Sequence, residues 1–180
     1  MNKQIVLLRG INVSGQKKIA MADLKMWLSE LAVTHVQTYI QSGNIVLSSE
    51  LENKTLSESI KNKIFEKSGF DVVTLSISEF ELQAAIDNNP FTEQVNNGFQ
   101  IYITFFEQEP DPENVKSVVD NCPINELLHF NSKLVYFFSE TGYGTAKVNN
   151  NFLEKKLKVS CTTRNWKSVE TLLNMSRNNE

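Results

Sequence analysis

Two groups of polar residues have the chemistry of an anion-binding site, and each contains an arginine. Arg9 ends the apolar run Ile5-Val6-Leu7-Leu8, and Arg164 lies in the run Thr162-Thr163-Arg164-Asn165-Trp166. The chain has only three arginines. A guanidinium group binds carboxylate or phosphate through two parallel hydrogen bonds, and it is hard to bury without such a planar partner. Both arginines are therefore candidates for contact with a bound anion.

The loop after Arg9 adds further donors, both side chains and the free backbone N–H groups of a helix start. The candidate ligand-binding residues are Arg9, Asn12, Ser14, Lys17, Lys18, Ser42, Asn44, Arg164 and Asn165. The spacing of Gly10 and Gly15 resembles a phosphate-binding loop, but Gln16 displaces the lysine and Lys18 replaces the expected Ser or Thr, which excludes a Walker A motif. The structural alternative is that Arg9 and Asn44 bond backbone carbonyls of a hairpin.

Arg164 is expected at the start of a helix, because Thr163 is a suitable N-cap residue. A cation in the first turn meets the positive end of the helix dipole, which costs about 0.3–1 kcal/mol unless a negative group is near. That group is either a carboxylate of the protein or a bound anion. Asn165 can bond the local backbone, and Trp166 begins an apolar stripe typical of a core-facing helix.

The elements that position these residues follow the order β-α-β-β-α-β in the first ninety residues, with an extra helix after them. The hydrophobic pattern predicts strands at 5–8, 36–40, 45–47 and 71–76, and a first helix at 21–31. Two further helices are expected to begin with capping boxes: one runs from the box at 55–58 to Gly69, and the other from the box at 78–81 to Asp87. The first two strands of such a unit run parallel. Arg9, the loop to Ala20 and the turn Ser42-Gly43-Asn44 should therefore converge at one edge of the sheet.

The second half repeats the same order of elements. Strands are predicted at 101–106, 127–130, 134–138 and 159–162, and helices at 110–119, 148–157 and from 166 onward. The repeat after roughly 95 residues favours two duplicated domains, although coincidence is the alternative because this order is common. The predicted domains are 1–90 and 95–180, with the boundary in 88–98, where Pro, Asn and Gly cluster.

Several stretches of the chain resemble a bacterial family catalogued as domain of unknown function 1697. They are Leu7–Val13 with Met21, Thr38–Asn44, Asn89-Pro90-Phe91, and Thr162–Trp166 with Val169 and Leu172. The family usually has Gly-Gly where this chain has Ser14-Gly15. The resemblance spans nearly the whole chain and implies a two-part α+β fold with ferredoxin-like halves. It implies no particular activity, cofactor or catalytic residue.

Composition excludes several classes of protein. The chain is 41% hydrophobic and 22% charged, which is ordinary for a globular protein, and its net charge of −3 argues against general attraction to nucleic acid or membranes. The N-terminal apolar run is too short for a signal peptide, so a cytoplasmic protein with reduced Cys122 and Cys161 is expected. The two histidines show no zinc spacing, and no cofactor or metal is predicted. Aromatics at 99–106 and 136–138 indicate core, because the basic glycine-containing motif of RNA-binding domains is missing.

The sequence thus predicts an α+β protein of two tandem ferredoxin-like (βαββαβ) halves, with antiparallel sheets and helices on one face. The leading functional expectation is binding of a small phosphorylated or carboxylated ligand at the edge around Arg9 and Asn44. The alternative is a protein-interaction or structural module in which the motifs hold the two halves together. The residue types name no general acid, general base or nucleophile, so enzymatic activity stays open, as do the ligand and the oligomeric state.

Overall fold

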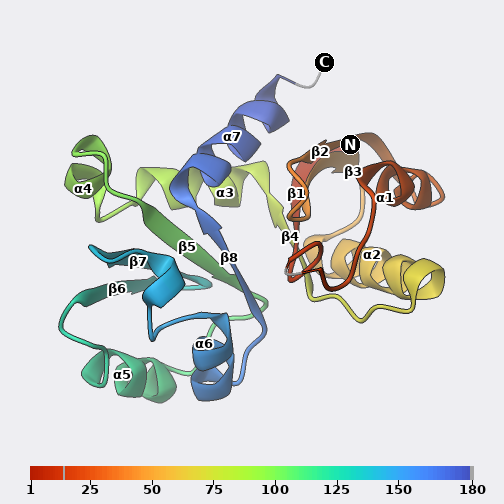
Figure 1. The fold of residues 1–180 in the computed structure, drawn as a ribbon. Helices are drawn as coiled ribbons and strands as arrows, with labels where there is room; N and C mark the ends of the chain where they lie inside the picture. The colour runs from red at the N-terminus through yellow and green to blue at the C-terminus, as the bar shows by residue number, and fades with distance from the viewer. Residues whose placement is uncertain (14, 179–180) are drawn as a thin grey trace. The chain divides into compact units, whose positions relative to one another are not determined.

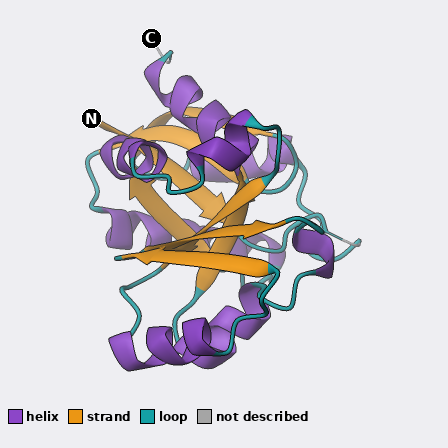
Figure 2. Ribbon diagram, turned by 90° about the vertical axis from the view of Figure 1, so that its left-hand side faces the viewer, coloured by secondary structure: helices purple, strands orange, loops and turns teal. Residues whose placement is uncertain are grey.

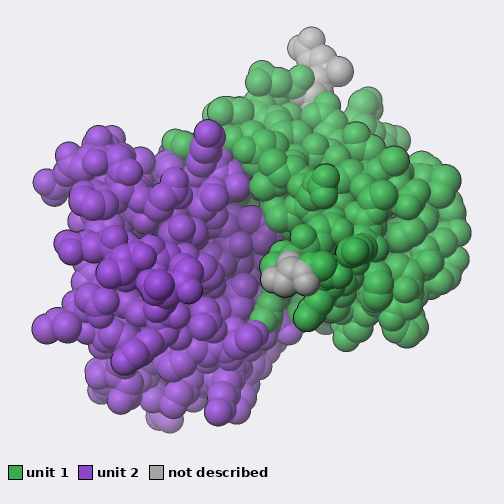
Figure 3. Space-filling model, in the orientation of Figure 1, with its two compact units in different colours: residues 1–84, 170–180 green, residues 85–169 purple. Residues whose placement is uncertain are grey.

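The computed structural model describes residues 1–13 and 15–178, and the chain divides into two compact units. Unit 1 comprises residues 1–84 and 170–180, and unit 2 comprises residues 85–169 (Figure 3). The sequence predicted halves at 1–90 and 95–180 with a boundary in 88–98. In the structure unit 2 begins at residue 85 and ends at residue 169, and the chain then returns to unit 1.

Unit 1 is built on an antiparallel sheet of four strands in the order β2-β3-β1-β4 (Figure 1). Its elements are β1 (Asn2–Leu8), α1 (Met21–Leu28), β2 (Val33–Tyr39), β3 (Asn44–Ser49), α2 (Asn53–Ser68) and β4 (Thr74–Ser78). Both β1 and β2 run antiparallel to β3, which lies between them, so they are parallel to each other, as predicted. Helices α1 and α2 pack on one face of the sheet.

The core under these helices follows from two patterns of apolar residues in the sequence, the alternation of the strands and the three- or four-residue spacing of the helices. Alternate residues of the central strands, such as Val6 and Leu8, meet residues spaced three or four apart on the helices, such as Leu24 and Leu28 on α1. On α2 the corresponding residues are Leu56, Ile60 and Ile64, all completely buried. Figure 2 distinguishes the strands from the helices that flank them.

Unit 2 repeats this topology with strands in the order β6-β7-β5-β8. The remaining elements of the chain are α3 (Glu79–Asp87), α4 (Thr92–Asn96), β5 (Ile101–Phe106), α5 (Pro112–Asp120), β6 (Glu126–Asn131), β7 (Leu134–Ser139), the 3-10 turn η1 (Tyr143–Thr145), α6 (Asn150–Leu157), β8 (Cys161–Asn165) and α7 (Trp166–Arg177). Helices α5 and α6 share a core with the sheet. The predicted α+β fold with two tandem ferredoxin-like halves is confirmed.

Several predicted boundaries were wrong, and for the two strands the reason is pairing with a neighbouring strand. The strand expected at 71–76 begins at Thr74, which pairs with Leu8 of β1. The strand expected at 159–162 runs from Cys161 to Asn165, because its pairing with β5 continues to Asn165. Helix α2 begins at Asn53, so the capping box predicted at 55–58 lies inside the helix instead of at its start. Helix α1 ends at Leu28, not at residue 31.

The capping box at Ser78 was predicted correctly, and it has a measurable expected effect. The backbone N–H of Ser78 donates to Glu81 Oε2 at 2.7 Å, and the N–H of Glu81 donates to Ser78 Oγ at 3.1 Å. We expect Ser78→Ala to lower the free energy of unfolding by about 1 kcal/mol in urea titration. Thr55→Ala is the matched control and should change stability little, because exposed Thr55 lies within α2. Equal losses in both variants would contradict the assignment.

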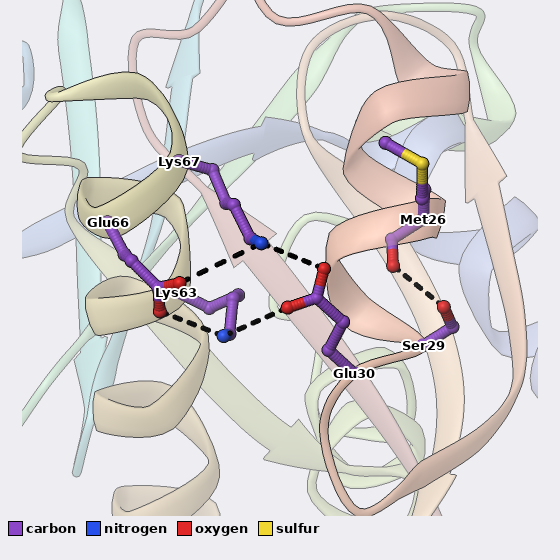
Figure 4. A network of polar contacts seen from close by, with 6 residues as sticks. All are labelled: Met26, Ser29, Glu30, Lys63, Glu66 and Lys67. Carbon is purple, nitrogen blue, oxygen red and sulfur yellow. Dashed lines mark hydrogen bonds and ion pairs between the residues drawn. The ribbon is translucent and has the colours of Figure 1, made fainter.

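A network of charged side chains, of which only Lys63 is half-buried, links Glu30, just after α1, to helix α2 (Figure 4). Lys63 Nζ lies 2.8 Å from a Glu66 oxygen and 3.2 Å from Glu30, and Lys67 Nζ lies 2.9 Å from Glu30. The hydrogen bonds from Lys67 and then Lys63 lower the pKa of the Glu30 carboxyl. Because this pKa is lower in the folded chain, the stabilisation is present at neutral pH and is lost as the pH falls through the folded pKa.

Candidate functional site

The end of β1 is held by neighbours on both sides. The N–H of Leu8 donates to the carbonyl of Gly43 at 2.7 Å, and the N–H of Arg9 donates to the carbonyl of Val73 at 2.9 Å. The predicted convergence of the β1 end with the turn at 42–44 is thereby confirmed. We call the region formed by residues 9–13, 15–19, 40–44 and 71–73 the loop edge.

Asn12 ties the loop after β1 to the turn between β2 and β3. Its Nδ2 donates to the carbonyls of Ile19 at 2.8 Å and Gln41 at 2.9 Å, and its Oδ1 accepts from the N–H of Ile19 at 2.9 Å. The backbone φ of Asn12 is 55°, in the left-handed region that Asn tolerates better than most residues. The side chain predicted to contact a ligand thus fixes the shape of the loop.

Asn44 has a similar role in the neighbouring turn. Its side chain is buried, and Nδ2 donates to the Tyr39 carbonyl at 3.2 Å and to Ser42 Oγ at 3.0 Å. The preceding Gly43 has a φ of 80°, and a Cβ there would lie 2.5 Å from the Cβ of Leu8. Only glycine allows the turn to approach β1 this closely.

The cations of the loop edge differ in their surroundings. Arg9 is half-buried, and Lys18 is exposed. Lys17 is half-buried and its Nζ donates to the backbone carbonyl of Asp71, so the loop is also fastened on the β4 side. Ser14, the remaining candidate of this loop, lies outside the described residues. The loop edge therefore carries three cations on a segment that is hydrogen-bonded on both sides.

Arg164 lies in strand β8 and not in a helical turn, which corrects the sequence prediction. Thr163 is a strand residue, and the N-cap is Asn165, whose Oδ1 accepts from the Ser168 N–H at 2.8 Å. The buried guanidinium of Arg164 donates to Thr162 Oγ1 at 2.9 Å and to the Thr163 carbonyl at 2.8 Å. Burial lowers its pKa to about 10. The cost of this placement is therefore desolvation, not opposition to a helix dipole.

A ring of hydrogen bonds around Thr163 was missed by the sequence analysis. Thr163 Oγ1 lies 2.5 Å from Asn150 Oδ1, 3.2 Å from Tyr143 Oη and 2.7 Å from Thr104 Oγ1. Tyr143 Oη in turn accepts from the Asn150 N–H at 3.2 Å. The ring fastens η1 and the start of α6 to the sheet. The only sequence feature that could have indicated this ring is the position of Tyr143 between Gly142 and Gly144.

The remaining reactive groups have structural surroundings. Cys122 and Cys161 are free thiols; Cys161 is fully buried, and burial raises the pKa of the Cys122 thiol. Tyr102 and Phe137 belong to the core of unit 2, as the sequence indicated, whereas Phe99 of the same predicted group is exposed. Within residues 1–13 and 15–178, no three His, Cys, Asp or Glu residues are grouped so that they could hold a metal ion. None of the helices in that part of the chain has both the length and the apolar character needed to cross a membrane.

Comparisons with known proteins agree with this architecture. The solved structure of the conserved bacterial protein SP0830 from Streptococcus pneumoniae superposes with a TM-score of 0.79 at 25% sequence identity, covering 99% of both chains. No curated protein matches the chain. A family model described as a protein of unknown function matches residues 1–136, which include the whole loop edge but not Thr162–Trp166. The chain therefore belongs to the DUF1697 family.

Proposed function

We propose that the chain binds a small anionic ligand, phosphorylated or carboxylated, at the loop edge. The observation that carries the proposal is that the Asn12 amide and the Lys17 side chain hold a loop bearing Arg9, Lys17 and Lys18 to both flanking segments. A site that is already ordered loses less conformational freedom on binding than a mobile one. The chain's net charge is −3, so attraction at this edge would be local and not a general property of the surface.

The residues of the edge have different roles in this proposal. The Arg9 guanidinium offers a planar pair of donors to the anion, and exposed Lys18 adds a positive charge that can adapt its position. Asn12 and Asn44 act as positioning residues, because their amides bond backbone groups of the loop and the turn. We assign the anion to the loop edge and not to Arg164, because Arg164 is buried whereas Arg9 is half-buried and Lys18 is exposed.

A structural role for the motif residues is the second candidate, and one observation favours it. The amides of Asn12 and Asn44 bond the backbone of their own unit, as expected of residues that maintain a fold. Under this candidate Arg9 would stabilise the edge, and added anions would have no specific effect.

Thermal unfolding in the presence of inorganic phosphate or sulfate separates the two candidates. At a hundred times its dissociation constant, an anion that binds only the folded state stabilises it by about 2.7 kcal/mol. For a chain of this size that is a rise in melting temperature of roughly 5–10 °C. We expect Arg9→Lys and Lys18→Gln to reduce this response, because the first removes the guanidinium fork and the second removes a charge.

Lys116→Gln is the control, since Lys116 is an exposed lysine on α5 that pairs with Asp120 at 2.6 Å. It should keep the full response to phosphate. If Arg9→Lys lowers the melting temperature without ligand while phosphate and sulfate stabilise every variant equally, the anion site is wrong and the structural role stands.

A further inference from the structure

We propose that the anion bound at the loop edge carries an apolar ring or chain, which lies on the side chains of Val13 and Ile40. This inference rests on the proposed function and specifies its ligand class. The ligand would be an ester or a substituted acid, such as a nucleotide or an aryl phosphate, instead of a bare inorganic ion.

The first support is the placement of these residues around a single side chain. The Asn12 amide bonds the backbone of both Ile19 and Gln41. Val13, Lys18 and Ile40 are the immediate chain neighbours of Asn12, Ile19 and Gln41. The exposed cation and the two apolar residues therefore each lie one position along the chain from a group that this amide hydrogen bond network joins.

The second support is that both apolar side chains are exposed. Val13 and Ile40 each expose 53% of their surface, whereas the adjacent Ile11 and Ile19 are buried in the core. Packing within the chain therefore accounts for Ile11 and Ile19 but not for the other two. A ligand with an apolar group would remove part of this exposed surface from water.

The third support is the backbone conformation of Ile40. Its φ is 50°, in the left-handed region, where a β-branched residue is a clear outlier. Glycine, asparagine or aspartate would adopt this conformation with less strain. An isoleucine with half of its surface in water gains less from folding than a buried one, and backbone strain of this kind clusters at functional positions.

Equilibrium titration with matched probes tests the proposal. The probes are inorganic phosphate, adenosine 5′-monophosphate, phenyl phosphate and adenosine, followed by thermal shift and by calorimetry. We expect at least one of the two esters to bind about tenfold or more tightly than inorganic phosphate, since covering two half-exposed aliphatic side chains is worth that factor. The ester that binds more tightly identifies the apolar group as a nucleoside or a simple aryl ring. Adenosine alone should bind far more weakly than its phosphate.

The decisive variant is Ile40→Asn, which keeps a residue suited to a positive φ and removes the apolar side chain. We expect it to abolish the preference for the ester over inorganic phosphate, and to keep or raise the melting temperature. Ile124→Asn is the control, because Ile124 is fully exposed on unit 2. If phosphate binds but neither ester binds better, or if Ile40→Asn preserves the preference, this inference is overturned while the proposed function stands. If Arg9→Lys leaves the affinity of the protein for every anion unchanged, the proposed function itself fails.

Discussion

Gly43→Ala is expected to lower the free energy of unfolding by roughly 3 kcal/mol or more. Two destabilising effects add at this position, backbone strain and steric overlap of the new Cβ. The φ of 80° lies in the left-handed region, and the new Cβ would be 2.5 Å from Leu8 Cβ and 3.1 Å from Ile11 Cδ1. Leu8 Cβ is attached directly to the backbone of β1, so it cannot move aside as the end of a flexible side chain could.

Urea unfolding followed by circular dichroism measures this loss, and Gly69→Ala separates the two costs. Gly69 ends α2 with a φ of 72°, and a Cβ there would meet nothing within 4 Å. Its substitution should therefore show the cost of conformation alone, about 1 kcal/mol. A Gly43→Ala variant no less stable than Gly69→Ala would show that the turn can retreat from β1.

Glu126→Gln is expected to lower the free energy of unfolding by about 2–4 kcal/mol, because it disrupts a buried carboxylate that satisfies two backbone donors. Glu126 Oε1 accepts from the Lys147 N–H at 2.8 Å, and Oε2 accepts from the Val148 N–H at 2.9 Å. Glutamine has one acceptor oxygen and an NH2 group, so one backbone N–H would face another donor. The remaining hydrogen bond would also lose its charge.

The same urea experiment, combined with amide hydrogen exchange, tests this prediction. Exchange at Lys147 and Val148 should accelerate, since the segment between η1 and α6 loses its attachment to β6. Glu107→Gln serves as the control because Glu107 is an exposed residue after β5, and its stability should be within about 0.5 kcal/mol of the parent. A loss below about 1 kcal/mol for Glu126→Gln, with unchanged exchange, would mean that the two N–H groups find other acceptors.

The order of the elements could be read from the sequence because apolar periodicity reflects burial directly. Val6 and Leu8 alternate on β1, and Leu56, Ile60 and Ile64 follow helical spacing on α2; the fold makes use of both patterns. Boundaries were harder, because they depend on partners distant in sequence. Ser78 and Thr55 begin the same local motif, yet only Ser78 stands where a strand ends and a helix begins.

The position of the candidate site could be predicted from the sequence, but the hydrogen-bond partners of each side chain could not be predicted. Parallel β1 and β2 place the Arg9 loop and the turn at Asn44 together by topology alone. The acceptors of the Asn12 amide are backbone carbonyls at residues 19 and 41, and no local pattern reveals them. Arg164 was misplaced for the same reason, since pairing with β5 extended the strand past Thr163.

The division of the chain has a consequence for its synthesis on the ribosome. Unit 2 is one continuous stretch, residues 85–169, whereas unit 1 needs both residues 1–84 and the segment from 170 onward. Although every strand of the unit 1 sheet precedes unit 2 in the sequence, the segment of unit 1 with buried Leu172 and Leu173 follows unit 2 and is translated after it. We therefore expect the N-terminal unit to be the second to mature, contrary to the usual order of domains in a growing chain. Nascent chains that stop near residue 170 would then release a finished unit 2 joined to an incomplete unit 1, a form that chaperones and proteases recognise by its exposed apolar surface.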